Sequence, residues 1–227
     1  MKSRIFALGV AGALTIFPAP SALAIPSSFT AVGEAETWNQ GKAERPVPNT
    51  LHYQGGRIRL EMAAPINAEG VSPFNVVLAQ EGGKVITLLN PAEKQAMKLE
   101  MSSLNEFAEN RSLQKISQFQ IKDFTTTFVG QSKVVGQAAI AGEKCTIREQ
   151  KNKQGHFKVW LSNRYQLPFR FIYLENDQPA FAWTVKKFTP ASNLGPSSFA
   201  IPPGYETVDL SEMLNGLDDN VKPLPAR

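Results

Sequence analysis

The amino-acid sequence predicts a mainly β protein of the α+β class, in which short strands pair antiparallel and one helix interrupts them. After residue 24, apolar residues recur mostly at every second position, which is the period of strands with one face in a core. Gly, Pro, Asn and Asp gather between these runs and form turns. Strands joined by tight turns pair antiparallel, because parallel pairing needs long crossover connections.

Residues 1–24 have the three parts of a secretory signal peptide. Lys2 and Arg4 carry its positive charge, residues 5–17 supply a short apolar core, and residues 22–24 place small side chains at the cleavage positions. The apolar core is too short to span a bilayer, which takes roughly 20 apolar residues, and no Cys follows it directly to take a lipid. We therefore expect an unlipidated protein that is released into the periplasm.

Removal of the signal peptide leaves one domain, which we expect over residues 25–210, and a tail over residues 211–227. Of 227 residues, 24 are removed and 203 remain, which is enough for one well-buried domain and short for two. The formal net charge falls from +4 to 22 minus 20, or +2. The basic residues are scattered, so we expect no nucleic-acid partner. We expect a monomer, and exposed sheet edges leave weak self-association open.

Three runs in the first half of the chain are predicted strands. Residues 27–38 read directly as strand. In residues 57–62 and 97–101, apolar residues alternate with charged ones, so each run has one apolar face. The apolar faces are Ile58, Leu60 and Met62 in one run and Met97, Leu99 and Met101 in the other.

Residues 81–97 are the most informative stretch for the fold. Gly82 and Gly83 turn the chain between two apolar strands, and Asn90-Pro91 ends the second of them. The stretch indicates an architecture and does not by itself indicate a function.

One segment breaks the period of two. Ser103 and Glu106 form a capping box, in which the hydroxyl and the carboxylate each satisfy a backbone donor at a helix start. Leu104 and Phe107 then begin an apolar stripe, and we predict a helix over residues 104–118. A helix with one apolar face packs most simply on the concave side or at the mouth of a curved sheet. There it either plugs the core or covers a cavity.

In the second half of the chain the alternation is aromatic, and turn residues gather at 152–155, 163–168 and 176–177. Residues 193–203 are expected to be extended or looped because they contain several prolines, and residues 205–208 are expected to add a final edge strand. The three apolar faces are Phe157, Val159 and Leu161; Phe169, Phe171 and Tyr173; and Phe181, Trp183 and Val185.

The sequence offers no catalytic or metal-binding constellation. Neither His52 nor His156 has a nucleophile or a metal ligand at a recognisable spacing, and we expect both at the surface, with His156 in a turn. Cys145 is the single cysteine, cannot form an internal disulfide, and is expected in the core. We therefore expect no enzymatic activity, no metal and no cofactor.

Four segments resemble the LolA-like superfamily of periplasmic outer-membrane lipoprotein carriers. Gly82–Pro91 resembles its strand–turn–strand, in which a Gly-Lys turn precedes an apolar strand and an Asn-Pro stop. Phe199–Tyr205 is similar to its Phe-x-x-x-Pro-x-Gly element, and Leu167–Arg170 resembles the Leu-Pro-x-Arg turn of its outer-membrane-sorting members. Arg57–Met62 sits where the family places an early sheet strand. The order of these segments agrees over about residues 29–208.

The resemblance implies a single curved antiparallel sheet that forms an unclosed half-barrel. One or more helices would cover its concave face, around an apolar cavity that takes up acyl chains. This chain departs from the true carrier in two ways: residues 27–38 read as strand where the carrier begins with a helix, and Gln54 and Gly55 stand where the family has Arg and Pro. The resemblance is therefore to an uncharacterised branch, whose ligand is a lipid, an acyl chain or a lipoprotein.

The large aromatic residues predict a ligand site independently of the resemblance. A curved sheet does not leave such side chains in water, since each gains roughly 1.5–3 kcal/mol by burial, and one helix covers them only in part. The remaining cleft fits an acyl chain; the alternative is a core filled by the aromatic residues themselves. Arg57 and Arg59 are candidates for a rim that meets a headgroup, with a solvated strand face as the alternative. The candidate cavity wall is Met62, Met97, Met101, Phe107, Phe157, Phe169, Phe171, Phe181 and Trp183.

Two functions of different class follow. The first is a non-enzymatic periplasmic binding or carrier protein for a lipid, an acyl chain or a lipoprotein, with an envelope membrane protein left open as a second partner. The second is an envelope sensor or scaffold of the same fold with a filled core and no ligand. A continuous apolar cavity of several hundred Å³ favours the first, and a core without voids favours the second.

Overall fold

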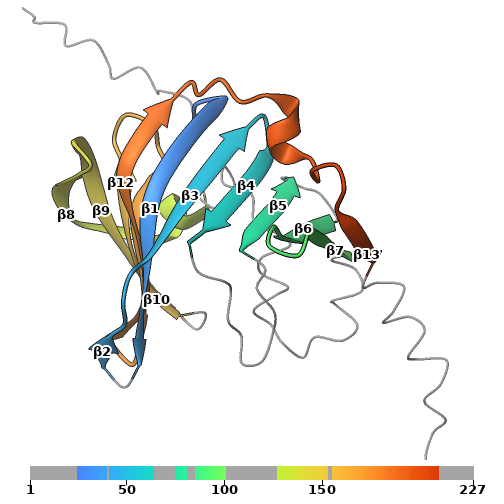
Figure 1. Cartoon of the computed structure of the whole chain (residues 1–227). Helices are drawn as coiled ribbons and strands as arrows, with labels where there is room; N and C mark the ends of the chain where they lie inside the picture. Colours follow the sequence, from blue (N-terminus) through green and yellow to red (C-terminus); the bar gives the residue numbers. More distant parts are fainter. Residues whose placement is uncertain are drawn as a thin grey trace, which may run out of the picture.

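The chain is described by a computed structural model over residues 25–39, 41–63, 75–80, 85–100, 127–152 and 155–209 (Figure 1). Three expectations lie outside these ranges, namely the signal peptide, the helix over residues 104–118 and the tail after residue 210. Two candidate wall residues, Met101 and Phe107, and the turn at Gly82-Gly83 also lie outside them.

The described strands form one large curved sheet that is mainly antiparallel and not closed into a barrel, as the sequence predicted (Figure 1). Neighbouring strands follow the order β13-β7-β6-β5-β4-β3-β1-β12-β11-β10-β9-β8, and the short β2 pairs with the end of β1. The strands are β1 (Ser28–Asn39), β2 (Lys42–Ala43), β3 (Val47–Gln54), β4 (Arg57–Met62), β5 (Val76–Gln80), β6 (Val85–Asn90), β7 (Gln95–Glu100), β8 (Lys133–Ile140), β9 (Glu143–Asn152), β10 (Gly155–Ser162), β11 (Pro168–Glu175), β12 (Gln178–Pro190) and β13 (Glu206–Asp209).

β1 joins two antiparallel meanders in the middle of the sheet. Strands β3 to β7 follow one another on one side of β1, and β12 to β8 follow one another on the other side. Among the described strands β1 and β12 are the longest, with 12 and 13 residues, and they pair along most of their length. The first strand of the domain therefore holds the two halves of the sheet together.

The last strand is present where the sequence predicted an edge strand, but its direction differs from the expected antiparallel pattern. β13 pairs in parallel with β7, so that Val208 lies opposite Met97. Parallel pairing needs a long connection. Residues 191–205 supply it, because they run from β12 in the middle of the sheet along the ends of β1, β3 and β4 to the far edge (Figure 1).

Tight turns join the strands of both meanders. Asn176 and Asp177 have φ angles of 50° and 62° and connect β11 to β12, as the sequence predicted. Gly55 and Gly56, with φ angles of 54° and 84°, connect β3 to β4 in the same way. Two-residue hairpins of this kind need positive φ at both central residues, which Gly, Asn and Asp adopt at low cost.

Register shifts bend the sheet. A β-bulge places one extra residue in one strand of a pair, which bends that strand and increases its twist. Most of the shifts lie between neighbours within the group β1, β12, β11 and β10. The shifts lie at Val32/Gly33, Val134/Gly136, Trp160/Leu161 and Tyr173/Leu174.

The larger buried cluster joins β1, β3, β9, β11 and β12 with the loop between β10 and β11. Phe169 is fully buried in it, with its ring centroid 5.0 Å from that of Phe188 and 6.3 Å from that of Tyr165. Cys145 is also buried in this cluster, as predicted, and burial raises the pKa of its thiol. The buried members are Phe29, Ala31, Tyr53, Cys145, Tyr165, Leu167, Phe169 and Val185.

The segment after β12 covers part of the convex face over the other meander. Residues 193–203 were expected to be extended or looped, but Pro196–Phe199 form a short 3₁₀ helix, η1. Pro196 favours this turn because its ring fixes φ near the helical value at the first position. Ile201 and Tyr205 then pack against a second buried cluster, which comprises Val76, Leu78, Leu89 and Ala96.

Both histidines are less exposed than the sequence indicated. His52 is half-buried on β3 with its Nδ1 atom 3.1 Å from the Thr30 hydroxyl, and burial lowers its pKa. His156 lies in β10 and not in a turn, with 14% of its side chain exposed. The reason is that Gly155 already pairs with Asn152, so the residue after it belongs to the ladder.

His156 lies between two carboxylates. Its Nε2 atom is 2.9 Å from Oε1 of Glu149, and its Nδ1 atom is 2.8 Å from Oδ1 of Asp177. Carboxylates accept hydrogen bonds, so a ring nitrogen that carries a proton donates to the carboxylate beside it. The hydrogen bond from His156 is the main cause that lowers the pKa of Glu149 to about 2. The hydrogen bond from Lys151 is the main cause of the lowered pKa of Asp177.

We expect Glu149→Gln to destabilise the protein in a pH-dependent way. The pKa of Glu149 is lower in the folded chain than its ordinary value of 4.5, so its contribution is present above about pH 4.5 and is lost as the pH falls toward 2. The free energy of unfolding should fall by about 1–2 kcal/mol at pH 6, and by a smaller amount near pH 3, which lies between the two pKa values. Urea denaturation at both pH values measures this. Glu143→Gln, on the same strand, is the control, and an equal loss at both pH values would contradict the assignment.

Candidate functional site

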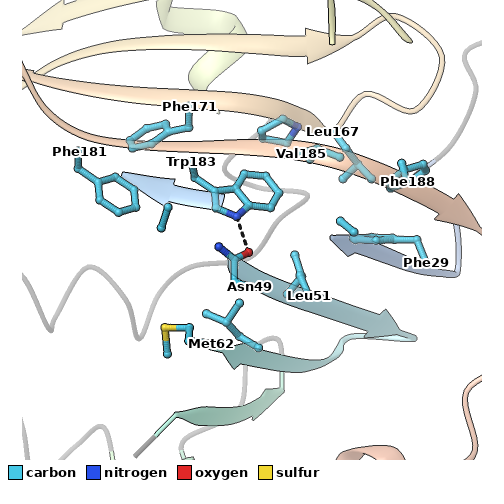
Figure 2. A pocket seen from close by; sticks show the side chains of 14 residues that line it. Phe29, Asn49, Leu51, Met62, Leu167, Phe171, Phe181, Trp183, Val185 and Phe188 are labelled. Carbon is cyan, nitrogen blue, oxygen red and sulfur yellow. Dashed lines mark hydrogen bonds between the residues drawn. The ribbon is translucent and has the colours of Figure 1, made fainter. Parts of the chain in front are cut away.

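An apolar hollow lies on the concave face, where the two halves of the sheet meet (Figure 2). Its volume is about 460 Å³, and the described residues enclose it only in part. Among the described residues that line it, Asn49 is the one polar residue, and none is charged. The wall comprises Phe29, Ala31, Ala35, Asn49, Leu51, Leu60, Met62, Leu167, Pro168, Phe171, Phe181, Trp183, Val185 and Phe188.

Strand register brings these side chains to one face. Trp183 on β12 pairs with Ala35 on β1 and with Phe171 on β11. Residues paired in an antiparallel ladder project to the same face, and every second residue along each strand follows them. The same rule places Leu51 on β3 beside Leu60 on β4. Five strands from both meanders therefore contribute to one wall.

Trp183 reaches across the hollow and binds Asn49 on β3. Its Nε1 atom donates a hydrogen bond of 2.8 Å to Oδ1 of Asn49, drawn as the dashed line in Figure 2. The Nδ2 atom of Asn49 donates to the carbonyl oxygen of Val47 at 3.3 Å. Each polar group of the wall therefore has a partner within the protein, as burial requires.

Gly33 allows the Trp183 ring to lie against β1. A Cβ atom at this position would lie 2.9 Å from the carbonyl oxygen of Thr184 and 3.0 Å from Nε1 of Trp183. Such approaches are too close for a carbon atom, so any larger residue would displace the indole or the strand. Gly33 thereby positions the largest side chain of the wall.

Aromatic rings close one end of the hollow. The ring of Phe29 stacks on that of Tyr53 at 5.0 Å, and the ring of Phe188 lies 5.4 Å from Phe29 and 4.7 Å from Tyr165. Phe29 and Phe188 line the hollow, and the two tyrosines are buried behind them in the larger cluster. Aromatic pairs in this range add to the gain from burial alone, which makes this end a well-packed wall.

The structure brings together some of the predicted wall residues and separates others. Phe169 is buried in the core, because Tyr165 of the preceding loop covers it. Phe157 on β10 contacts the ring of Phe171 at 5.7 Å and does not reach the hollow, and Met97 lies on β7 near the far edge. The predicted residues that line the hollow are Met62, Phe171, Phe181 and Trp183.

Arg57 and Arg59 lie on the face of β4 opposite the hollow. The guanidinium of Arg57 lies 5.0 Å from the ring centroid of Phe199. Arg59 donates a hydrogen bond of 3.1 Å to the carbonyl oxygen of Ser198 and forms an ion pair with Glu61. Arg57 thus contacts η1, and Arg59 contacts both η1 and its own strand. Neither arginine lines the hollow.

Sequence reasoning missed the wall residues of β1 and β3. The signal was present in the alternation of Phe29, Ala31, Gly33 and Ala35, where small residues recur on one face of the strand. Small residues within a strand mark a place where another group approaches the backbone closely. Here that group is Trp183.

The other features of the described residues do not indicate a second kind of functional site. No group of three or more His, Cys, Asp or Glu side chains among them is arranged to hold a metal ion. The part of the chain that is described contains no helix long and apolar enough to cross a membrane. A smaller hollow of about 280 Å³, lined by Arg164, Tyr165 and residues 26–28 and 190–191, lies outside the apolar wall.

No protein-family model matches the chain, and no curated protein is significantly similar to it. Solved structures are similar in fold. An uncharacterized conserved protein from Thermus thermophilus is 12% identical with a TM-score of 0.53, covering 81% of this chain and 91% of that one. MucB, in the MucA/MucB complex of Pseudomonas aeruginosa, is 13% identical with a TM-score of 0.47, covering 80% and 58%. A putative outer membrane lipoprotein-sorting protein domain from Vibrio parahaemolyticus is 13% identical with a TM-score of 0.38, covering 76% and 89%.

At these identities the likeness concerns the fold.

Proposed function

We propose that this chain is a non-enzymatic binding or carrier protein of the cell envelope, which takes an acyl chain of a lipid or lipoprotein into the hollow. The observation that supports the proposal is an open hollow of about 460 Å³ with an apolar wall. Its volume lies in the range of ligand sites, roughly 300–1,000 Å³. Open apolar surfaces of this kind mark binding sites in soluble proteins.

The energetics favour a long chain. Each methylene group that moves from water into an apolar site contributes roughly 0.8 kcal/mol. Association costs several kcal/mol in lost freedom of motion, so short chains bind weakly and long ones bind well. We expect affinity to rise with chain length until the hollow is full.

The predicted signal peptide and the sequence resemblance support a place in the periplasm, where acyl chains of lipids and lipoproteins need shielding from water. In this proposal the acyl chain is the partner that occupies the hollow. An envelope membrane protein that delivers or receives the ligand remains a prediction from the sequence.

Trp183 provides a direct test of binding. Bromine atoms quench tryptophan fluorescence at short range, so a dibrominated octadecanoic acid should quench the protein when its chain occupies the hollow. Trp183→Phe should lose most of this quenching, because Trp183 lines the hollow. Trp160→Phe is the matched control, because Trp160 stacks on Arg170 and is not part of the wall, so this variant should keep the quenching.

If the brominated acid does not quench the wild-type protein at any concentration up to its solubility limit, the proposed carrier function is refuted. The second function, an envelope sensor or scaffold without a ligand, would then stand. Equal quenching in the wild type and in Trp183→Phe would place the chain elsewhere on the protein and would also refute the proposed site.

A further inference from the structure

We infer that the hollow holds one hydrocarbon chain without polar substituents by its methyl end and selects for the chain, not for the head group. The inference rests on the proposed function and names the ligand class more narrowly. It covers amphiphiles with one inserted alkyl chain, whether the head is anionic, cationic or neutral.

The first argument is the charge of the wall. No lining residue among those described carries a charge, and the nearby arginines Arg57 and Arg59 contact Phe199 and Ser198 on the other face of β4. An ionised head inside this wall would lose its hydration without gaining a partner, which costs far more than the chain contributes. The head therefore stays in water at the open side.

The second argument is the polarity of the wall. Among the described lining residues Asn49 is the one polar residue; its Oδ1 atom accepts a hydrogen bond from Trp183, and its Nδ2 atom donates one to Val47. Two other amide atoms on the neighbouring strands lack a partner, Oδ1 of Asn75 and Nδ2 of Asn90, but both are buried and neither residue lines the hollow. The described part of the wall thus presents almost no polar surface to a hydroxyl, ester or amide group of the ligand.

The third argument is the volume. A methylene group is about the size of a water molecule, whose share of liquid volume is roughly 30 Å³. The hollow of about 460 Å³ therefore matches about one long alkyl chain. Two or three chains of similar length would need two or three times the space, so a ligand with several chains would insert one of them.

These arguments predict how affinity depends on ligand chemistry. Hexadecanoic acid and hexadecyltrimethylammonium have the same chain and opposite head charges, so their affinities should agree within about threefold. A hydroxyl at the far end of hexadecanoic acid would be buried without a partner, so this analogue should bind at least about tenfold more weakly.

The test measures displacement of the dibrominated octadecanoic acid, through recovery of Trp183 fluorescence, by each of the three probes below its micelle concentration. Native mass spectrometry of the same mixtures counts the chains bound to each protein. The inference predicts near-equal displacement by the two charged probes, weak displacement by the hydroxylated probe, and one chain per protein.

Three results would overturn the inference and leave the proposed function standing. They are a preference of more than about tenfold for one head charge, equal binding of the hydroxylated chain, and two chains bound per protein. Failure of all three probes and of the brominated acid to bind would instead refute the proposed function.

Discussion

Replacement of Ala35 by Phe is expected to abolish binding of acyl chains while the sheet stays folded. Ala35 lines the hollow and pairs with Trp183, so a phenyl ring at this position would project into the space proposed for the acyl chain. The ring fills existing space, so it does not need to displace packed atoms, which is the usual cost of a larger side chain. We expect affinity for the brominated acid to fall by at least about tenfold.

The matched control for this variant is Val32→Phe. Val32 lies on the same strand, with 38% of its surface exposed, and is not part of the wall. It should bind the acid like the wild type. Circular dichroism and thermal melting would show that both variants are folded. If a folded Ala35→Phe variant binds the acid as well as the wild type does, the acyl chain does not occupy the hollow.

Replacement of Phe169 by Ala is expected to cause a large loss of stability. Phe169 is fully buried and packs between Tyr165 and Phe188, which join the β10–β11 loop to β12. Truncation of a buried Phe leaves a cavity and costs about 3–5 kcal/mol. For a domain of this size, such a loss lowers Tm by roughly 6–20 °C.

The comparison variant is Val134→Ala on β8, where the residue is 57% exposed. Surface truncations of this kind change stability by less than about 0.5 kcal/mol. Calorimetry or urea denaturation of both variants measures the difference. A loss below about 1 kcal/mol for Phe169→Ala would show that the aromatic cluster is looser than the ring distances indicate.

The local features of the fold were accessible from the sequence, because they depend on neighbouring residues. The alternation of residues 57–62 predicts β4, and Asn176-Asp177 predicts the hairpin between β11 and β12. The order of the strands was not accessible. Placement of β1 between β3 and β12 depends on contacts between residues that lie far apart in the sequence, such as Ala35 and Trp183.

The candidate site shows the same division between local and distant information. Large side chains such as Phe171 and Trp183 indicate an apolar face by themselves, so part of the wall was predicted. Ala35 and Gly33 become part of the site only through what lies across from them. The period of two places Arg59 on the opposite face from Leu60, but sequence alone does not show that η1 covers that face.

The most direct measurement of the central claim is anomalous diffraction from crystals of the protein with a brominated alkyl chain. We predict bromine peaks inside the hollow, in contact with Phe171, Phe181 and Trp183, and the head group in solvent at the open side. Bromine peaks at any other place on the protein, or a hollow filled by the protein's own side chains, would contradict the account.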